Sequence, residues 1–465
     1  MTEYTLQSRW VRRGGRLEYY GMRRREYLFR NTVRLGPRRK RIIGRLPSEL
    51  SRAEISALGP LFGTVVVAKD EYRPVPRSLA EARFCRTCPA NDFMIPGLEL
   101  DEEGICPMCR TADDVKRLRS VVPLVSDIPR SGGSDFDAAL FYTGGKDSTF
   151  LLWWLAVKKK LRVLAMTWEI PYMSDSARVS IENARKRLPN VEFISRKVPD
   201  GILRRVYRKL MDETGTTCLC PSLAYVLFYP EMTARHIPCF IAGNEPVQAL
   251  GLYYNHMAPK AAYSFADNRF FSFVINAGRV MTFRPPLKRG QFHTLATMRT
   301  LVRGESLPQR LSGYSNPLVR SAVEALREAP ELIAPLKNSL RKSSASGNIP
   351  AFLAVDLDEI CGGRYDWEKV KDTIVEECGW AAPEGGKKLL HTSCSIEKCK
   401  DYFQLRNFRE CRTHMIPFSA IEISLTGRGR PEDREKLIYE EEKMLGFAER
   451  PEEGCELMRR YVEGV

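Results

Sequence analysis

The sequence predicts a doubly wound α/β fold that follows a basic N-terminal region and a small cysteine module. Three observations predict this arrangement. Strand-like and helix-like segments alternate from residue 137 onward, four cysteines stand in two close pairs before them, and arginines crowd the first 54 positions. Strands that alternate with helices at this spacing build a parallel sheet with helices on both faces. Such sheets bind ligands beyond the carboxyl ends of their strands.

The N-terminal region holds most of the excess charge. The 465 residues carry a net charge of +16, and residues 1–54 contribute +10, with 15 Lys and Arg against 5 Asp and Glu. Alternation over 27–35 is typical of a strand. Arginines interleaved with aromatic residues can bind phosphate backbones. They can equally pair with acids inside a small strand-rich accessory region, and composition alone favours this second interpretation.

The cysteine module is Cys85-x2-Cys88 followed, after 17 residues, by Cys106-x2-Cys109. Two pairs at this spacing can place four thiolates tetrahedrally around one Zn²⁺ ion. An Fe–S cluster or four reduced thiols are the alternatives. Four cysteines leave no open position on a metal, so the site is expected to be structural. Such a module can contribute to a nucleic-acid-binding surface or hold the fold together as a clip.

The rest of the composition is that of an ordinary globular protein, with 43% hydrophobic and 28% charged residues. The first residues lack the apolar core of a secretory signal. The longest apolar stretches, such as 151–157, are far shorter than the roughly 20 residues that span a bilayer. We therefore expect a cytoplasmic protein without a membrane span, in which thiols stay reduced.

Hydrophobic periodicity and helix caps give the order of the α/β elements. Strands are expected at 137–143, 162–168, 191–198 and 237–243, and helices at 147–160, 174–188, 200–213 and 221–236. The signals weaken after residue 250. There, 339–348 is expected to be an exposed loop and 431–445 a helix with a solvated charged face.

The sharpest motif joins the first expected strand to the first expected helix, and it reads Thr143-Gly144-Gly145-Lys146-Asp147-Ser148. Two glycines let the backbone approach an anion, and the helix start offers N–H groups and a positive dipole end. Lys146 adds a full charge, Thr143 and Ser148 add hydroxyl donors, and Asp147 can hold Mg²⁺ or fix the turn. The spacing differs from Walker A. A plain glycine turn is the alternative, but six matched positions between strand and helix favour a pyrophosphate-binding loop.

This loop resembles the SGGKDS signature of the PP-loop ATP pyrophosphatases, with Thr143 in place of the first serine. The resemblance implies an adenine nucleotide α-hydrolase-like fold of the HUP type. It also implies cleavage of ATP between the α and β phosphates, which activates a substrate oxygen as its adenylate. By the same resemblance, the segment Met166-Thr167-Trp168 would line the adenine pocket. Gly243 and Glu245, at the end of the fourth expected strand, would contact nucleotide, substrate or Mg²⁺.

The segment from Cys85 to Cys106, with Pro96-Gly97 and Asp101–Gly104 inside it, resembles the start of the N-acetyl sugar amidotransferase family. Further likenesses lie at 377–380 and 391–402. The resemblance covers 85–250 well and 370–410 in patches, and it leaves out the first 80 residues. It implies amidation of a carboxylate on a nucleotide-linked N-acetyl sugar in surface polysaccharide (lipopolysaccharide) biosynthesis. The implied cofactors are ATP, Mg²⁺ and Zn²⁺, and a glutaminase subunit would supply the ammonia.

With these resemblances the chain divides into four expected segments. They are a basic accessory region (1–80), a zinc-ribbon module (81–115), a PP-loop ATP-binding α/β domain (136–260) and a mainly helical substrate or partner region (261–465).

The other cysteines allow several interpretations. Cys218, Cys220, Cys394 and Cys399 could form a second metal or Fe–S site, Cys218 or Cys220 could carry a persulfide, or all four could simply pack. The family has Cys-x-x-Cys where this chain has Cys218-x-Cys220, which leaves a shared role in doubt. Cys239 is expected in the core, and among the histidines His391 has the best functional case.

The chain is accordingly expected to be an amidotransferase that forms AMP and pyrophosphate from ATP. Thr143, Lys146 and Ser148 would stabilise the departing pyrophosphate, and Asp147 would orient the loop or the metal. The second hypothesis is sulfur transfer to tRNA or a small molecule through the same adenylate chemistry. The third is a zinc-ribbon nucleic-acid-binding protein that only senses ATP. A nucleic-acid partner for the basic arm stays open.

Overall fold

The computed structural model describes residues 2–24, 31–111, 133–244, 269–288, 290–304, 317–362, 367–383, 393–426, 428 and 450–465. By compactness the chain forms two units. Unit 1 consists of Met1–Asp113, Leu311–Tyr314 and Gln404–Phe447, and unit 2 of Asp114–Arg310, Ser315–Phe403 and Ala448–Val465. Each unit therefore combines segments that are far apart in the sequence.

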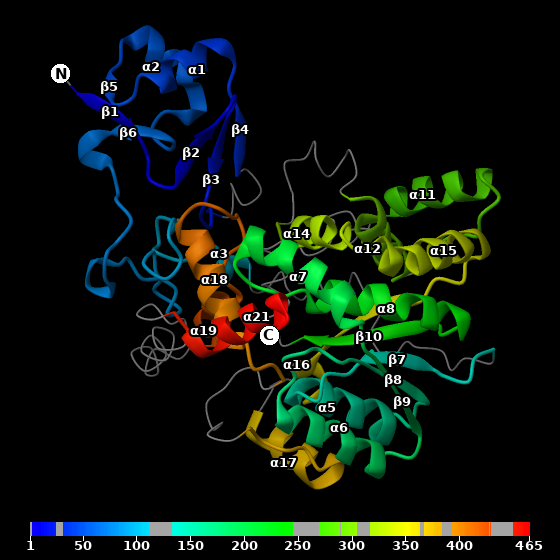
Figure 1. The fold of residues 1–465 in the computed structure, drawn as a ribbon. Coiled ribbons are helices and arrows are strands. Elements are labelled where there is room, and N and C mark those ends of the chain that lie inside the picture. The colour runs from blue at the N-terminus through cyan, green and yellow to red at the C-terminus, as the bar shows by residue number, and fades with distance from the viewer. Residues whose placement is uncertain are drawn as a thin grey trace. The chain divides into compact units, whose positions relative to one another are not determined.

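Unit 2 is built on a five-stranded parallel sheet (Figure 1). Its strands are β7 (Ala138–Phe141), β8 (Val163–Trp168), β9 (Val191–Arg196), β10 (Cys239–Asn244) and β11 (Ala351–Asp356). They lie in the order β11-β10-β7-β8-β9, and each neighbouring pair is parallel. The strand order reverses between β7 and β10, which is the switch point at which doubly wound sheets bind ligands. The predicted α/β fold is confirmed.

Helices cover both faces of this sheet (Figure 1). One face carries α5 (Lys146–Trp153) with its π-helical extension η7 (Trp154–Lys158), α6 (Asp175–Arg187) and α17 (Trp367–Cys378). The helices packed on the other side are α7 (Asp200–Thr214), α8 (Cys220–Ala234), α12 (Gln291–Arg303), α14 (Pro317–Leu326), α15 (Pro330–Ser346) and α21 (Glu452–Glu463). Because both faces are covered, all six residues of β8 are buried, which explains why it reads as a continuous apolar run. Unit 2 also contains α11 (Arg269–Met281) and α16 (Leu357–Ile360).

Local signals explain why the expected elements of 137–243 form close to their expected bounds. The side chain of Ser174, for example, accepts a hydrogen bond from the backbone N–H of Ala177 at 3.2 Å and so caps α6. Gly215, with a φ of +77°, ends α7.

Two findings differ from the expectations for the chain after residue 250. The segment 339–348, expected to be an exposed loop, lies mostly in α15, so that prediction is wrong. Two of its serines have hydroxyl partners that are compatible with the helix: the hydroxyl of buried Ser343 donates to the carbonyl of Leu340 and lies 2.7 Å from the hydroxyl of Tyr229, and that of Ser346 donates to the carbonyl of Ser343. Strand β11 was not expected. The helix expected at 431–445 lies outside the described residues.

Unit 1 contains two small antiparallel sheets, β5-β1-β6 and β2-β3-β4. The strands are β1 (Glu3–Leu6), β2 (Trp10–Arg13), β3 (Arg16–Tyr19), β4 (Thr32–Arg34), β5 (Ser48–Glu49) and β6 (Val66–Ala68). The helices are α1 (Pro37–Gly44), α2 (Arg52–Leu58), α3 (Pro107–Thr111) and α19 (Phe418–Thr426), with single 3-10 turns η2 (Gly59–Leu61), η3 (Lys69–Glu71) and η4 (Leu79–Glu81). The two units divide inside α18 (Glu397–Arg409).

No helix within the described stretches is both long and apolar enough to cross a membrane.

Candidate functional site

The hexapeptide Thr143–Ser148 lies at the carboxyl end of β7, which pairs with β10 at the switch point. Gly144 makes the turn with a φ of +72°, and Gly145 is the N-cap of α5, which begins at Lys146. The first N–H groups of a helix have no acceptor inside it and stand at the positive end of its dipole. The loop is therefore placed and shaped to bind an anion such as a phosphate.

Two hydroxyl groups hold the loop in this shape. The Oγ of Ser148 lies 3.1 Å from the Oγ1 of Thr143, and it also accepts a hydrogen bond from the backbone N–H of Thr143 at 3.3 Å. The backbone N–H of Gly145 donates to Thr143 Oγ1 at 3.4 Å. Threonine in place of the signature's first serine therefore keeps the hydroxyl that these contacts need.

The loop also carries an opposed pair of charges. The Nζ of Lys146 lies 2.7 Å from the Oδ1 of Asp147, and the two side chains are 11% and 22% exposed. A polyphosphate would give Lys146 a further anionic partner, and its Mg²⁺ ion would give Asp147 a further cationic one. The residues present therefore fit a magnesium–polyphosphate ligand.

Segments from more than 200 residues later form a wall of this loop. The indole Nε1 of Trp380 donates a hydrogen bond to the carbonyl of Gly144 at 3.2 Å, inside the protein. Ser393 lies beside Gly145, since a Cβ atom added to Gly145 would lie 3.7 Å from the Cβ of Ser393. The segment that begins at Ser393 also pairs with the chain after β8, through a bridge between Met173 and Cys394. The segments near 380 and 394 that resemble the amidotransferase family therefore lie beside the loop Thr143–Ser148, which is called the phosphate loop below.

Gly144→Ala is expected to destabilise the loop, whereas Gly201→Ala is not. A Cβ at position 144 would lie 2.5 Å from the backbone oxygen of Ala177, and the residue would keep its left-handed backbone. That backbone alone costs a non-glycine residue about 1–2 kcal/mol. At Gly201, in the first turn of α7, the Cβ position is open, and alanine there should be neutral or stabilising by about 0.4–1 kcal/mol. Thermal melting with and without ATP measures both effects. Equal melting temperatures for the two variants would contradict the described turn.

Three of the other residues expected at the nucleotide site lie in β8 and β10, the two strands that pair with β7. Thr167 lies next to the last residue of β8 and donates its hydroxyl to the carbonyl of Tyr142 at 2.9 Å, which ties β8 to the residue before the loop. Trp168 is 7% exposed, and its indole Nε1 has no hydrogen-bond partner among the described residues. Gly243 lies in β10, and Glu245 lies outside the described residues. Their roles toward ATP stay predictions.

The four cysteines of the predicted module form one buried cluster in unit 1. All four sulfur atoms lie within 4.8 Å of one another. Cys88 and Cys106 are 3.7 Å apart, and Cys85 and Cys109 are 4.0 Å apart. A tetrahedral site with Zn–S bonds of about 2.3 Å has S–S edges of about 3.8 Å. The cluster can therefore hold a zinc ion with little rearrangement.

Backbone groups around the cluster suit thiolates. The N–H groups of Thr87 and Cys106 point to the sulfur of Cys85 at 3.5 and 3.3 Å, and that of Cys109 points to the sulfur of Cys106 at 3.5 Å. Donors of this kind orient sulfur ligands and offset their negative charge. The turn between the two pairs is fixed by the carboxylate of Asp101, which accepts from the backbone N–H of Ile105 at 2.9 Å.

The remaining candidate cysteines all lie in unit 2. Cys218 and Cys220 are hydrogen-bonded to each other, and their electrostatic interaction with Cys394 places that thiol nearby. Cys399 interacts with Cys455 and also, more weakly, with Cys394. Among the described residues, only the four cysteines of the module lie close enough together to hold a metal. A second metal site made of Cys218, Cys220, Cys394 and Cys399 is therefore not found there.

The pair Cys218 and Cys220 has a cation beside it. Lys400, in the unit 2 part of α18, forms an ion pair with Glu397 and interacts electrostatically with Cys218. The hydrogen bond with Cys220 and the positive charge of Lys400 lower the pKa of Cys218. Burial raises the pKa of Cys394 to about 12. Cys218 is therefore the thiol of this group best suited to react as a thiolate.

Iodoacetamide is expected to modify Cys218 before Cys394 at neutral pH, because the thiolate is the reacting species and Cys218 has the lower pKa. Lys400→Met should move the alkylation of Cys218 to higher pH, because it removes the cation that favours the thiolate. Lys398→Met, at an exposed position of the same helix, serves as the control. Peptide mass spectrometry after timed labelling measures these rates. Labelling of Cys394 ahead of Cys218 would contradict the assignment.

Several N-terminal arginines are used inside unit 1. Buried Arg9 donates to the backbone carbonyls of Tyr20, Phe408 and Arg409, and its guanidinium lies 4.9 Å from the ring centroid of Phe408. Arg23 pairs with Glu99 at 3.3 Å. These arginines therefore support the interpretation of an accessory region with internal pairing. Nucleic-acid binding by the others stays a prediction.

No protein-family model matches the chain, and no curated protein matches it. The fold and the clusters define a class: an α/β protein with a five-stranded parallel sheet, small antiparallel N-terminal sheets and a buried four-cysteine cluster that can hold a zinc-like metal. His391, the histidine singled out in the sequence, lies outside the described residues.

Proposed function

We propose that the chain is an ATP-dependent enzyme that forms AMP and pyrophosphate and adenylates a carboxylate for amidation by ammonia. The observation that carries this proposal is the placement of Thr143–Ser148 as a turn and helix start at the switch point of the sheet. Doubly wound sheets bind nucleotides at this place. The resemblance to N-acetyl sugar amidotransferases points to a nucleotide-linked N-acetyl sugar as the acceptor.

The proposed chemistry has two displacements. A carboxylate oxygen of the acceptor attacks the α-phosphorus of ATP, and the bond to the bridging oxygen of the β-phosphate breaks, so pyrophosphate leaves with that electron pair. Ammonia then attacks the acyl carbon, AMP leaves with its oxygen, and the extra proton passes to solvent. The protein's part is to neutralise charge and hold the reactants in line. A glutaminase subunit or free ammonium would supply the nitrogen.

The loop residues have separate parts in this scheme. Lys146 and the N–H groups at the start of α5 would stabilise the charge of the departing pyrophosphate. The hydroxyls of Thr143 and Ser148, which already contact each other, would donate to the phosphate oxygens. Asp147 would hold Mg²⁺, which supplies further charge neutralisation when bound.

Sulfur transfer is the second candidate function, and the thiols beside the loop favour it. Cys394 directly follows Ser393, which packs against Gly145, and it lies near Cys218 and Cys220. A persulfide on Cys218 or Cys220 could attack an adenylate held by the same loop and displace AMP, and a second thiol of the group could then release the thiolated product by forming a disulfide with the first. The acceptor in that case would be tRNA or a small molecule.

Measuring AMP separates these functions. The full chain is incubated with ATP and Mg²⁺ in parallel mixtures that contain carboxylate-bearing nucleotide sugars with ammonium, or tRNA with a sulfide source. AMP formation only with the sugar and ammonium supports amidation, and AMP formation only with tRNA and sulfide supports sulfur transfer. Absence of AMP in every mixture, together with tight RNA or DNA binding, would favour a protein that only senses ATP.

A further inference from the structure

Helix α11 of unit 2 presents an apolar stripe to solvent. Phe270, Phe273, Val274, Val280 and Met281 recur at helical spacing along one side, and Phe270, Phe273 and Met281 are 77%, 69% and 80% exposed. Ile275 and Arg279 lie on the opposite side of the helix and line a pocket. Large apolar side chains gathered on one solvent-facing side of a helix mark a binding surface.

The chain around this stripe is strongly basic. Residues 269–304 contain seven Lys and Arg and no Asp or Glu. Phe283, which follows the helix, is 98% exposed and stands between two of the arginines in the sequence. Exposed aromatic side chains combined with an uncompensated positive charge are typical of helices that lie at a membrane interface.

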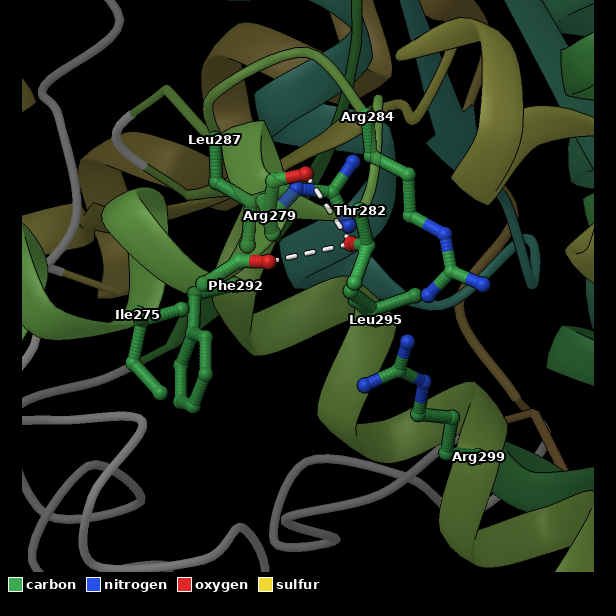
Figure 2. Close-up of a pocket in the computed structure, with 9 residues that line it drawn as sticks. Ile275, Arg279, Thr282, Arg284, Leu287, Phe292, Leu295 and Arg299 are labelled. Atoms are coloured by element: carbon green, nitrogen blue, oxygen red, sulfur yellow. Dashed lines mark hydrogen bonds between the residues drawn. The ribbon is translucent and has the colours of Figure 1, made fainter.

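A pocket of about 290 Å³ opens beside α11, and three arginines line it (Figure 2). Arg284 and Arg299 extend toward each other at one end, while Ile275 and Phe292 form an apolar end (Figure 2). None of the three arginines has a carboxylate partner among the described residues. Burial, together with the charges of Arg299 and Arg284, lowers the pKa of Arg279. The positive charges therefore repel one another, and a bound anion would relieve that repulsion.

Two hydrogen bonds hold the side chain of Arg279 in place at this pocket. Arg279 is 6% exposed, and its guanidinium donates to the carbonyl of Pro285 at 2.7 Å and to that of Ser344 at 3.0 Å. Its Nη1 atom is buried and has no hydrogen-bond partner among the described residues. A buried guanidinium nitrogen that lacks a partner is costly unless a ligand accepts its hydrogen bond. A phosphate oxygen is a suitable ligand for that nitrogen.

The pocket is separate from the phosphate loop. Ser344, which Arg279 binds, lies a few residues before β11 begins. Gln291, at the start of α12, binds the carbonyl of Ile349 at 2.8 Å, also just before β11. The arginine pocket therefore lies near the amino end of β11, whereas the phosphate loop lies at the carboxyl end of β7 in the same parallel sheet.

We propose that α11, Phe283 and the arginine pocket form a docking surface for membranes that contain anionic phospholipids. The apolar stripe enters the region between headgroups and acyl chains, and Arg279, Arg284 and Arg299 bind a headgroup phosphate. The chain lies on the membrane through this surface and does not span it. This inference is independent of the function proposed for the phosphate loop.

Charge decides between a lipid surface and a second copy of the chain. Pairing two copies of this face would bring the seven basic residues of one against the seven of the other, with no acid in either segment. The negative potential of an anionic membrane instead attracts each basic residue near it. The apolar stripe and the basic pocket therefore both favour an anionic membrane over a second copy of the chain.

Co-sedimentation of the full chain with vesicles tests the proposal. We expect binding to vesicles that contain phosphatidylglycerol to be much tighter than to phosphatidylcholine alone, and to weaken as salt rises. The double change R284Q/R299Q should weaken binding roughly 25-fold, since each basic residue at such a surface strengthens it about fivefold. Phe273→Ser should weaken it roughly tenfold through lost apolar burial. Neither change touches the fold's core, because these side chains are exposed.

Val179→Ser and Arg185→Gln on α6 are matched controls, because they remove an exposed apolar side chain and an exposed charge on the other side of the sheet. Two results would overturn the proposal. One is binding that does not depend on lipid charge, and the other is binding that R284Q/R299Q and Phe273→Ser weaken no more than the control variants do. Calorimetric binding of inorganic phosphate without vesicle binding would also overturn it, in favour of a free-phosphate site. Self-association of the lipid-free chain that Phe273→Ser abolishes would overturn it in favour of a dimer interface.

Discussion

Lys146→Ala is expected to abolish pyrophosphate release from ATP while the chain stays folded. Lys146 is the full positive charge of the phosphate loop, and it stands at the first position of α5. Losing one donor to a charge that develops in the transition state typically slows a reaction by about 10²–10³-fold. Losing a full charge should cost at least that much. Its ion pair with Asp147 joins adjacent residues at the start of α5.

The matched control for this variant is Lys159→Ala, since Lys159 is an exposed lysine just after the π-helical end of the same element. Coupled pyrophosphate assays give the rates, and circular dichroism with thermal melting reports the fold. Turnover by Lys146→Ala at the wild-type rate would remove the loop from the proposed mechanism. A Lys146→Ala variant that fails to fold would be replaced by Lys146→Met, which keeps the side-chain length.

Removal of the metal is expected to unfold the cysteine module of unit 1. The four cysteines of this module are all buried and together can hold a single Zn²⁺ ion; they are Cys85, Cys88, Cys106 and Cys109. Structural zinc contributes roughly 10–16 kcal/mol in small zinc domains, which is as large as the whole stability of an ordinary domain. Protons compete with zinc for thiolates, so the metal should be lost as the pH falls and retained as it rises.

Cys106→Ser tests the cluster against Cys411→Ser, a substitution of a half-buried cysteine in the same unit that lies outside the cluster. Atomic emission gives the zinc content of each purified variant, and melting curves give stability. We expect the first variant to lose both zinc and stability and the second to keep both. Full zinc content in Cys106→Ser would show that the four thiols are not the ligands.

Hydrophobic pattern allowed the first four strands of the sheet to be predicted, because a parallel strand covered on both faces reads as an unbroken apolar run. The fifth, β11, has a similar run at 351–356, but weaker signals surround it and only its pairing with β10 gives it a place. The stretch 339–348 shows the reverse case. Its serines resemble a loop in composition, yet partners such as Tyr229, more than 100 residues earlier, support their helical position.

The candidate site also has parts that could be predicted from the sequence and parts that could not. The loop Thr143–Ser148 could be recognised because its chemistry is local: glycines, a lysine and hydroxyls between a strand and a helix. Trp380 and Ser393 could not be assigned to its wall, since contacts at that separation depend on how α17 and the following segment pack. The arginines at 279, 284 and 299 were missed as well. The absence of acids across 269–304 was the signal that could have found them.

The distance in sequence between Gly144 and Trp380 has a consequence for how the protein is made. The hydrogen bond between them joins positions 236 residues apart. At roughly 5–20 residues per second, a ribosome needs on the order of 10–50 s to extend the chain from the first partner to the second. A growing chain whose residues 143–148 have just left the ribosome therefore still lacks Trp380, which binds the carbonyl of Gly144 in the finished fold. Nucleotide binding should mature only near the end of synthesis.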